Sequence, residues 1–170
     1  MFKILFICTA NICRTPIAKY YLRDKVEKSG LSGKIEVDSA GTWARGGQSA
    51  AENSIAVCKE NKLDASEHTS TGITAAIMND SDLILCMSIQ HKLDLVSIFP
   101  QHAEKIFLLK EYSNETPEKR LSIPDPYGRK IEVYREVFRE IASEVDRFFP
   151  EIKRLVSNGA VAFSDQGKRA

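Results

Sequence analysis

A cysteine and an arginine lie six positions apart near the start of this chain, and the residues around them could attack a phosphate. An apolar run over residues 4–7, typical of a buried strand, leads into Cys8, and Arg14 is followed by Thr15 and Pro16. Pro16 suits the first turn of a helix, and a loop between a strand and a helix directs several backbone N–H groups toward one point, where an oxyanion binds. Arg14 and the helix dipole favour the thiolate of Cys8, which is the nucleophilic form. The segment therefore predicts attack by the Cys8 sulfur on a bound phosphate ester.

The loop between these two residues supplies the predicted phosphate-binding groups. Its backbone N–H groups and the Arg14 side chain would hold the phosphate oxygens. The predicted binding residues are Thr9, Ala10, Asn11, Ile12, Cys13, Arg14 and Thr15. The Thr15 hydroxyl can also donate a hydrogen bond to the Cys8 sulfur and stabilise the thiolate. If Cys8 instead faces the core as a small apolar residue, this prediction fails.

The same chemistry needs a proton donor, because the leaving group of a phosphate ester otherwise departs as an anion. Asp125 is the candidate, in a loop that Pro124 and Pro126 make stiff. An aspartate before a proline is also a common turn former. Spacing alone therefore leaves both interpretations of Asp125 open.

Apolar, strand-like runs alternate along the chain with amphipathic segments, a pattern typical of βαβ units around a parallel sheet. The predicted strands cover residues 3–9, 34–39, 82–87 and 105–109. The predicted helices cover residues 16–29, 48–62 and 90–99, with a short helical turn over 74–78 and a last helix from Ile131. We therefore expect a single α/β domain with a four-stranded parallel sheet and helices on both faces. The phosphate-binding loop over residues 8–15, here called the P-loop, follows the first strand.

Glycine and proline mark the expected ends of these elements. Gly30 is predicted to cap the C-terminal end of the first helix. Pro150 predicts a kink, or a fresh short helix from Glu151. After Val156, polar residues and glycine predominate, which predicts a domain over residues 1–156 and a disordered tail over residues 157–170.

Composition limits the partners and the setting of the chain. With 170 residues, 43% of them hydrophobic, it can bury one sizeable core. Its net charge of +1 comes from interspersed acidic and basic residues, which argues against nucleic-acid binding, and no apolar run is long enough to span a membrane. Four cysteines without disulfide-framework spacing indicate a reducing, cytoplasmic location.

The sequence also argues against a metal site or a bound cofactor. No cysteine pair has the spacing of metal ligands, and the glycines form no nucleotide-binding motif. The histidines are scattered along the chain, as His68, His91 and His102. We therefore expect the chemistry to use protein side chains alone.

The P-loop segment resembles the pattern Cys-x-Gly-Asn-x-Cys-Arg-Ser-Pro of the low-molecular-weight protein tyrosine phosphatases. Segments over residues 38–42, 83–87, 106–112 and 125–128 follow in the order that this family uses, so the resemblance covers about residues 3–155. It implies hydrolysis of phosphotyrosine in proteins and of small aryl phosphates, through a cysteinyl-phosphate on Cys8, with Asp125 as general acid and base and with no metal. Phosphotyrosine proteins are then the implied partners, and phosphate, vanadate and arsenate the implied inhibitory oxyanions.

The resemblance also implies supporting residues and the walls of a substrate pocket. Hydrogen bonds among side chains hold the P-loop in this family, and the corresponding residues here are Asn11, Thr15, Ser39 and His68. The candidate walls of a slot for a flat aromatic ring are Ile12, Trp43 and Tyr127. Ala10 replaces the family's glycine, and a positive φ there would cost about 1 kcal/mol and weaken the anion cradle.

The substrate and two other functions stay open. The apolar Ile12 favours an aromatic phosphotyrosine ring, whereas the related protein arginine phosphatases typically have a threonine here that can meet a guanidinium group. Protein arginine phosphatase is therefore the alternative. An arsenate reductase would need Cys58 and Cys86 to relay a disulfide. A phosphate-binding module without turnover would follow if Ala10 disabled catalysis.

Cys13 is predicted to be the redox partner of Cys8. It lies five residues after Cys8, close enough across a curled loop to form a disulfide under oxidant. We therefore expect reversible, redox-sensitive loss of activity. The other interpretation is a small residue that faces the core.

Overall fold

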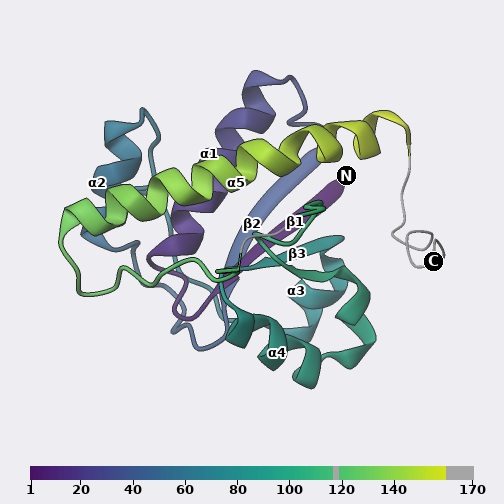
Figure 1. Cartoon of the computed structure of the whole chain (residues 1–170), viewed down its shortest axis with the longest axis horizontal. Coiled ribbons are helices and arrows are strands. Elements are labelled where there is room, and N and C mark those ends of the chain that lie inside the picture. The colour runs from purple at the N-terminus through teal and green to yellow at the C-terminus, as the bar shows by residue number, and fades with distance from the viewer. Residues whose placement is uncertain (117–118, 160–170) are drawn as a thin grey trace.

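Four parallel strands form one sheet in the order β2-β1-β3-β4 (Figure 1). The computed structural model describes residues 1–116 and 119–159. Its strands are β1 (Phe2–Cys8), β2 (Ile35–Gly41), β3 (Leu83–Cys86) and β4 (Ile106–Leu108). The predicted α/β class and the four parallel strands are confirmed, with small shifts at the strand ends.

Helices cover both faces of the sheet, as the sequence predicts. They are α1 (Arg14–Lys28), α2 (Glu52–Glu60), α3 (Ala75–Asp80), α4 (Ile89–Ile98) and α5 (Ile131–Ser157), with a short 3-10 helix η1 (Pro100–Lys105). Buried side chains of α1, α2 and α5 share one core cluster with the first face of the sheet, and those of α3 and α4 share another with the second face. In Figure 1, α5 and α1 accordingly lie on one side of the strands and α3 and α4 on the other. None of the described helices is both long and apolar enough to cross a membrane.

Strand β1 sends alternate side chains to the two clusters and thereby orients Cys8. Phe6 and Cys8 lie in the cluster with α1 and α5, whereas Leu5 and Ile7 lie in the cluster with α3 and α4. β1 also lies where the strand order reverses, because β2 flanks it on one side and β3 on the other. Open α/β sheets bind ligands at the carboxyl end of the strands at such a switch point. The P-loop leaves β1 at that edge.

Two helix ends show where local signals succeed and fail. Gly30 has a φ of 67°, and its N–H donates to the Glu27 carbonyl at 2.9 Å, so the predicted end of α1 is confirmed. The helix predicted over residues 48–62 is wrong at its start, since α2 begins only at Glu52. Upstream of it, Ser49 pairs with Thr69 in an isolated β-bridge. Long-range pairing therefore overrides the helical pattern there.

Helix α5 runs as one helix through Pro150, so the fresh helix predicted after this proline does not form. Proline leaves the carbonyl four residues earlier without its helical partner. Here both Pro150 and Asp146 are exposed, and the buried Phe149 and Ile152 keep the helix packed on the core. α5 ends at Ser157, the first residue of the predicted tail, and residues 160–170 of that tail lie outside the described residues.

Candidate active site

The P-loop (residues 8–15) connects the end of β1 to the first turn of α1. The helix begins at Arg14, two residues before the predicted start at Pro16. Cys8 is 3% exposed and Arg14 5% exposed, whereas Thr9 lies exposed on the rim of the loop. The Cys8 Sγ lies 3.2 Å from the Thr15 Oγ1. The loop thus encloses a cysteine and an arginine that the sequence singles out.

Asn11 organises the P-loop from within. Its Nδ2 donates to the Thr15 Oγ1 at 2.8 Å and to the Ser39 Oγ at 2.9 Å, and its Oδ1 accepts from the Thr71 backbone N–H at 2.8 Å. Because the Thr15 oxygen already accepts from Asn11, its own proton is free to be donated to the Cys8 sulfur. Asn11, Thr15 and Ser39 are therefore brought together, and Thr71 joins them although the sequence analysis passed over it.

The expected strain at Ala10 is wrong. The P-loop residue with a left-handed backbone is Asn11, at φ 59°, and Ala10 is not among the residues with positive φ. Asparagine tolerates this region better than other residues with a β-carbon, since its short polar side chain hydrogen-bonds locally. The Ala10 methyl therefore adds no left-handed strain to the loop.

His68 holds the P-loop from the side as a neutral imidazole. Its Nε2 lies 2.7 Å from the Asn11 carbonyl oxygen, and since a carbonyl only accepts, Nε2 carries the proton. Its Nδ1 is buried without a partner among the described residues. Burial lowers the pKa of His68. The neutral ring thus fits this buried position, and the structure brings His68 into contact with Asn11.

Arg14 links the P-loop to the loop that carries Asp125. Its Nη1 donates to the Ile123 carbonyl at 3.0 Å, and its Nη2 lies 3.5 Å from the Asp125 Oδ2. The Ile123 N–H in turn donates to the Met87 carbonyl, just beyond β3, at 2.7 Å. The Arg14 Nε is buried and has no partner among the described residues, so it remains a donor for an oxyanion.

Asp125 both forms a turn and faces the guanidinium. Its Oδ1 accepts from the Tyr127 N–H at 3.1 Å, which is the turn contact that an aspartate before proline favours. Its Oδ2 points to Arg14, and the side chain is 52% exposed. The two interpretations of Asp125 are thus compatible, because one oxygen serves each contact.

Gly41, at the end of β2, is a site residue that the sequence analysis did not single out. It pairs with Cys8 across the sheet, and a Cβ there would lie 2.4 Å from the Thr9 carbonyl oxygen and 3.0 Å from the Asn11 nitrogen. Any side chain at this position would collide with the P-loop backbone. The sequence did carry a signal for Gly41, because this residue lies within the segment over residues 38–42 that resembles the family.

His91 is a second missed residue, placed by the first turn of α4. Its Nε2 lies 2.9 Å from the Thr9 Oγ1, and its Nδ1 lies 2.8 Å from the Ser88 Oγ. Burial, and then the charge of Arg14, lower the pKa of His91 to about 4. The sequence analysis considers His91 only as one of three scattered histidines that could bind a metal. No metal-binding group of three His, Cys, Asp or Glu residues occurs in the described ranges.

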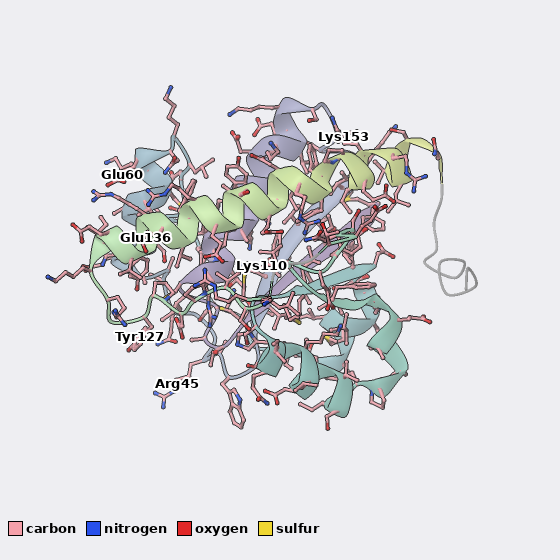
Figure 2. All side chains as sticks on the ribbon, viewed as in Figure 1. Arg45, Glu60, Lys110, Tyr127, Glu136 and Lys153 are labelled. Atoms are coloured by element: carbon pink, nitrogen blue, oxygen red, sulfur yellow. The ribbon has the colours of Figure 1, made fainter. Side chains whose placement is uncertain are left out.

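The three candidate pocket residues lie at the P-loop or on loops beside it. Ile12 is half-buried and packs on the core cluster of α1 and α5. The Trp43 N–H donates to the Thr9 carbonyl at 2.9 Å, while its side chain is 81% exposed. Tyr127 is 70% exposed, and Figure 2 shows it near the edge of the molecule where Arg45 also projects. Both large rings are thus accessible from solvent.

The remaining cysteines differ in the face of the sheet that they occupy. Cys58, on α2, shares the core cluster of Cys8, whereas Cys86, on β3, belongs to the cluster on the opposite face. Burial raises the pKa of both thiols, that of Cys58 to about 12. All four cysteines are free thiols.

Known proteins share this fold. The family described as low molecular weight phosphotyrosine protein phosphatase matches residues 3–158. A protein-arginine-phosphatase of Bacillus subtilis (strain 168) is 31% identical over 151 residues, which make up 89% of this chain and 97% of that protein.

Two solved structures extend the comparison. The YwlE arginine phosphatase, as a mutant with a phosphorylated active site serine, has a TM-score of 0.83 and 29% identity, over 90% of this chain and 97% of that one. The tyrosine phosphatase Wzb from Escherichia coli K30, in complex with sulphate, has a TM-score of 0.77 and 30% identity, over 89% of this chain and 99% of that one.

Proposed function

Because the chain belongs to the low molecular weight phosphotyrosine protein phosphatase family, we propose that it hydrolyses phosphotyrosine in proteins, and small aryl phosphates, through a cysteinyl-phosphate on Cys8. One observation carries this proposal. The Cys8 sulfur lies beside the Thr15 hydroxyl in a loop whose Arg14 also reaches toward Asp125. This arrangement at one edge of the sheet supports Cys8 as the nucleophile, Arg14 as the cation that binds the anion and Asp125 as the proton donor.

The proposed reaction has two steps. The P-loop amides and Arg14 hold the phosphoryl oxygens while the Cys8 thiolate attacks phosphorus, and Asp125 gives its proton to the departing phenolic oxygen. Asp125 then takes a proton from water, which attacks phosphorus and releases phosphate and the thiolate. The Thr15 hydroxyl stabilises that leaving thiolate. Phosphate, vanadate and arsenate should compete for the same loop, and these steps use only protein groups and water.

Replacing Asp125 with asparagine should slow the enzyme most on esters with poor leaving groups. Asparagine can keep the contact with the Tyr127 N–H but has no proton to transfer, so kcat/KM for phenyl phosphate should fall about 100-fold, and for p-nitrophenyl phosphate much less. The measurement is the slope of log kcat/KM against leaving-group acidity. Asp94→Asn, in an exposed pair on α4, is the matched control. An unchanged slope in Asp125→Asn would contradict the role of Asp125 as acid.

Ile12 supports phosphotyrosine over phosphoarginine as the substrate. Its side chain is half-buried against the core and offers the P-loop an apolar wall, which suits an aromatic ring. A guanidinium group there would lose water without gaining a hydrogen bond from the side chain. The similarity to both arginine and tyrosine phosphatases leaves protein arginine phosphatase as the second candidate.

The choice of substrate can be tested with two peptides that differ only in phosphotyrosine or phosphoarginine. We expect the wild type to have the higher kcat/KM on phosphotyrosine, and Ile12→Thr to lower that preference about tenfold by adding a hydroxyl. Ile12→Val, which keeps an apolar branched wall, should behave as the wild type does. Faster turnover of phosphoarginine by the wild type would reverse the assignment.

Cys13 supports a redox response of the enzyme. Its Sγ lies 3.5 Å from the Tyr134 hydroxyl, and burial raises its pKa to about 11, so Cys13 is a protonated thiol at neutral pH and a poorer target for peroxide than a thiolate. A peroxide would convert Cys8 to a sulfenic acid, and Cys13 would then form the disulfide with release of water. Both sulfurs thereby remain recoverable by a thiol reductant.

After a peroxide pulse, dithiothreitol should restore most wild-type activity but only a minor share of Cys13→Ser activity. The serine variant cannot trap the sulfenic acid as a disulfide, so Cys8 should proceed to irreversible oxides. Recovered activity and the mass of the P-loop peptide report the two outcomes. Cys58→Ser is the control. Equal recovery in wild type and Cys13→Ser would remove the protective role.

The other two functions receive less support from the site. Cys86 faces the opposite side of the sheet from Cys8, and burial on α2 raises the Cys58 pKa to about 12, so neither suits a disulfide relay for arsenate reduction. The idea of an inactive binding module rested on strain at Ala10, and the left-handed residue is Asn11 instead. Four free thiols also suit the cytoplasm, where we place this enzyme.

A further inference from the structure

We infer that His91 is a positioning residue for the phosphatase reaction, because it holds Thr9, the residue after the nucleophile, in a hydrogen-bond chain that begins at Ser88. This inference rests on the proposed function of the same site. The chain has two short links: the Ser88 Oγ lies 2.8 Å from the His91 Nδ1, and the His91 Nε2 lies 2.9 Å from the Thr9 Oγ1. It joins the first turn of α4 to the P-loop, 82 residues apart in sequence.

The direction of each hydrogen bond follows from counting protons. The Ser88 oxygen accepts the His91 backbone N–H at 3.3 Å, as the N-cap of α4, so its single proton can be donated to the His91 Nδ1. A neutral imidazole with an accepting Nδ1 carries its proton on Nε2, which then donates to the Thr9 hydroxyl. The buried site, with the Arg14 charge nearby, favours this neutral ring.

Thr9 is then fixed from two sides. Its carbonyl accepts the Trp43 N–H at 2.9 Å, while its side chain accepts from His91. Thr9 is the exposed residue of the P-loop, so packing alone does little to hold it. With both contacts in place, the peptide groups on either side of Thr9 keep one orientation next to the Cys8 sulfur. His91 therefore acts on the transition state through the P-loop backbone and does not touch substrate.

The test compares variants that keep or remove the bond to Thr9. His91→Phe keeps a flat ring without donor or acceptor, and it should lower kcat for p-nitrophenyl phosphate about tenfold with KM changed less than about threefold. His91→Gln keeps an N–H near the position of Nε2 and should recover part of that loss. Thr9→Val should match His91→Phe, and the double variant should be no slower than the slower single variant. His102→Phe, which removes an exposed bond to Asn79, is the matched control and should leave kcat unchanged.

A second measurement keeps the test independent of the rate. Inhibition by vanadate, which mimics the transition state, should weaken in His91→Phe in step with kcat, whereas inhibition by phosphate should weaken less. Unchanged kcat in a folded His91→Phe, equal rates in His91→Gln and His91→Phe, or additive losses in the double variant would overturn the inference. Failure of the wild type itself to hydrolyse any aryl phosphate would instead contradict the proposed function.

Discussion

Replacing Cys8 with serine should lower kcat for aryl phosphates by at least about four orders of magnitude while binding of phosphate or vanadate survives. The serine hydroxyl is nearly the size of the thiol, but at neutral pH it stays protonated and is a far weaker nucleophile. The binding groups remain, because the P-loop is held by Asn11 and His68 and not by the sulfur. Catalysis and anion binding should therefore separate in this one variant.

Three measurements on Cys8→Ser check that separation. Initial rates give the loss in kcat, calorimetric titration with vanadate gives the affinity, and mass spectrometry of rapidly quenched wild type should find one phosphoryl group on the peptide that contains Cys8. Cys58→Ser removes a buried thiol of the same core cluster and should keep its rate. Substantial turnover by Cys8→Ser, or a phosphoryl group trapped elsewhere, would contradict the mechanism.

Replacing Arg14 with lysine should lower kcat about a thousandfold although the charge is kept. The guanidinium donates to the Ile123 carbonyl, faces Asp125 and keeps its buried Nε available for an oxyanion. A lysine ammonium is a single nitrogen without a planar fork, so it cannot serve these three directions at once. The loss should include both the transition-state contact and the anchoring of the Asp125 loop.

The anchoring of the Asp125 loop by Arg14 can be measured separately. Amide hydrogen exchange over residues 123–127 should become faster in Arg14→Lys, because the contact to the Ile123 carbonyl is weakened. Arg135→Lys changes an exposed pair with Glu60 and should alter neither the rate nor the exchange of this loop. If Arg14→Lys retains more than about a tenth of wild-type kcat, a point charge suffices and the proposed need for a planar guanidinium is wrong.

The parts of this fold that could be predicted are those encoded locally. Strands β1, β3 and β4 are predominantly apolar, and β2 begins with alternating buried and exposed residues. The Cys8 segment carries its strand, loop and helix signals within residues 4–16, so the sheet and the P-loop could be derived without tertiary contacts. The start of α2 could not be placed, because Ser49 pairs with Thr69 across the fold. Helical periodicity carries no information on such a pairing.

The missed site residues share one physical reason. Gly41 matters because the P-loop backbone passes close to its Cα, and His91 matters because α4 brings it to Thr9. Both are contacts between segments that only the folded sheet juxtaposes. Likewise, the resemblance pointed to Ala10 as the P-loop residue with a left-handed backbone. In the structure this residue is Asn11, whose side chain is held by hydrogen bonds to other segments of the chain.

The shape of the P-loop depends on contacts that the protein makes with itself. Asn11 holds a left-handed backbone through partners on β2 and on the segment around Thr71, and Gly41 leaves room for it. The entropic cost of ordering the P-loop is therefore met when the chain folds and not when an ester binds. If the P-loop binds the phosphate group of an ester in this preformed state, it should bind free orthophosphate as well. The rate of the proposed phosphatase is therefore expected to fall as the concentration of inorganic phosphate around it rises.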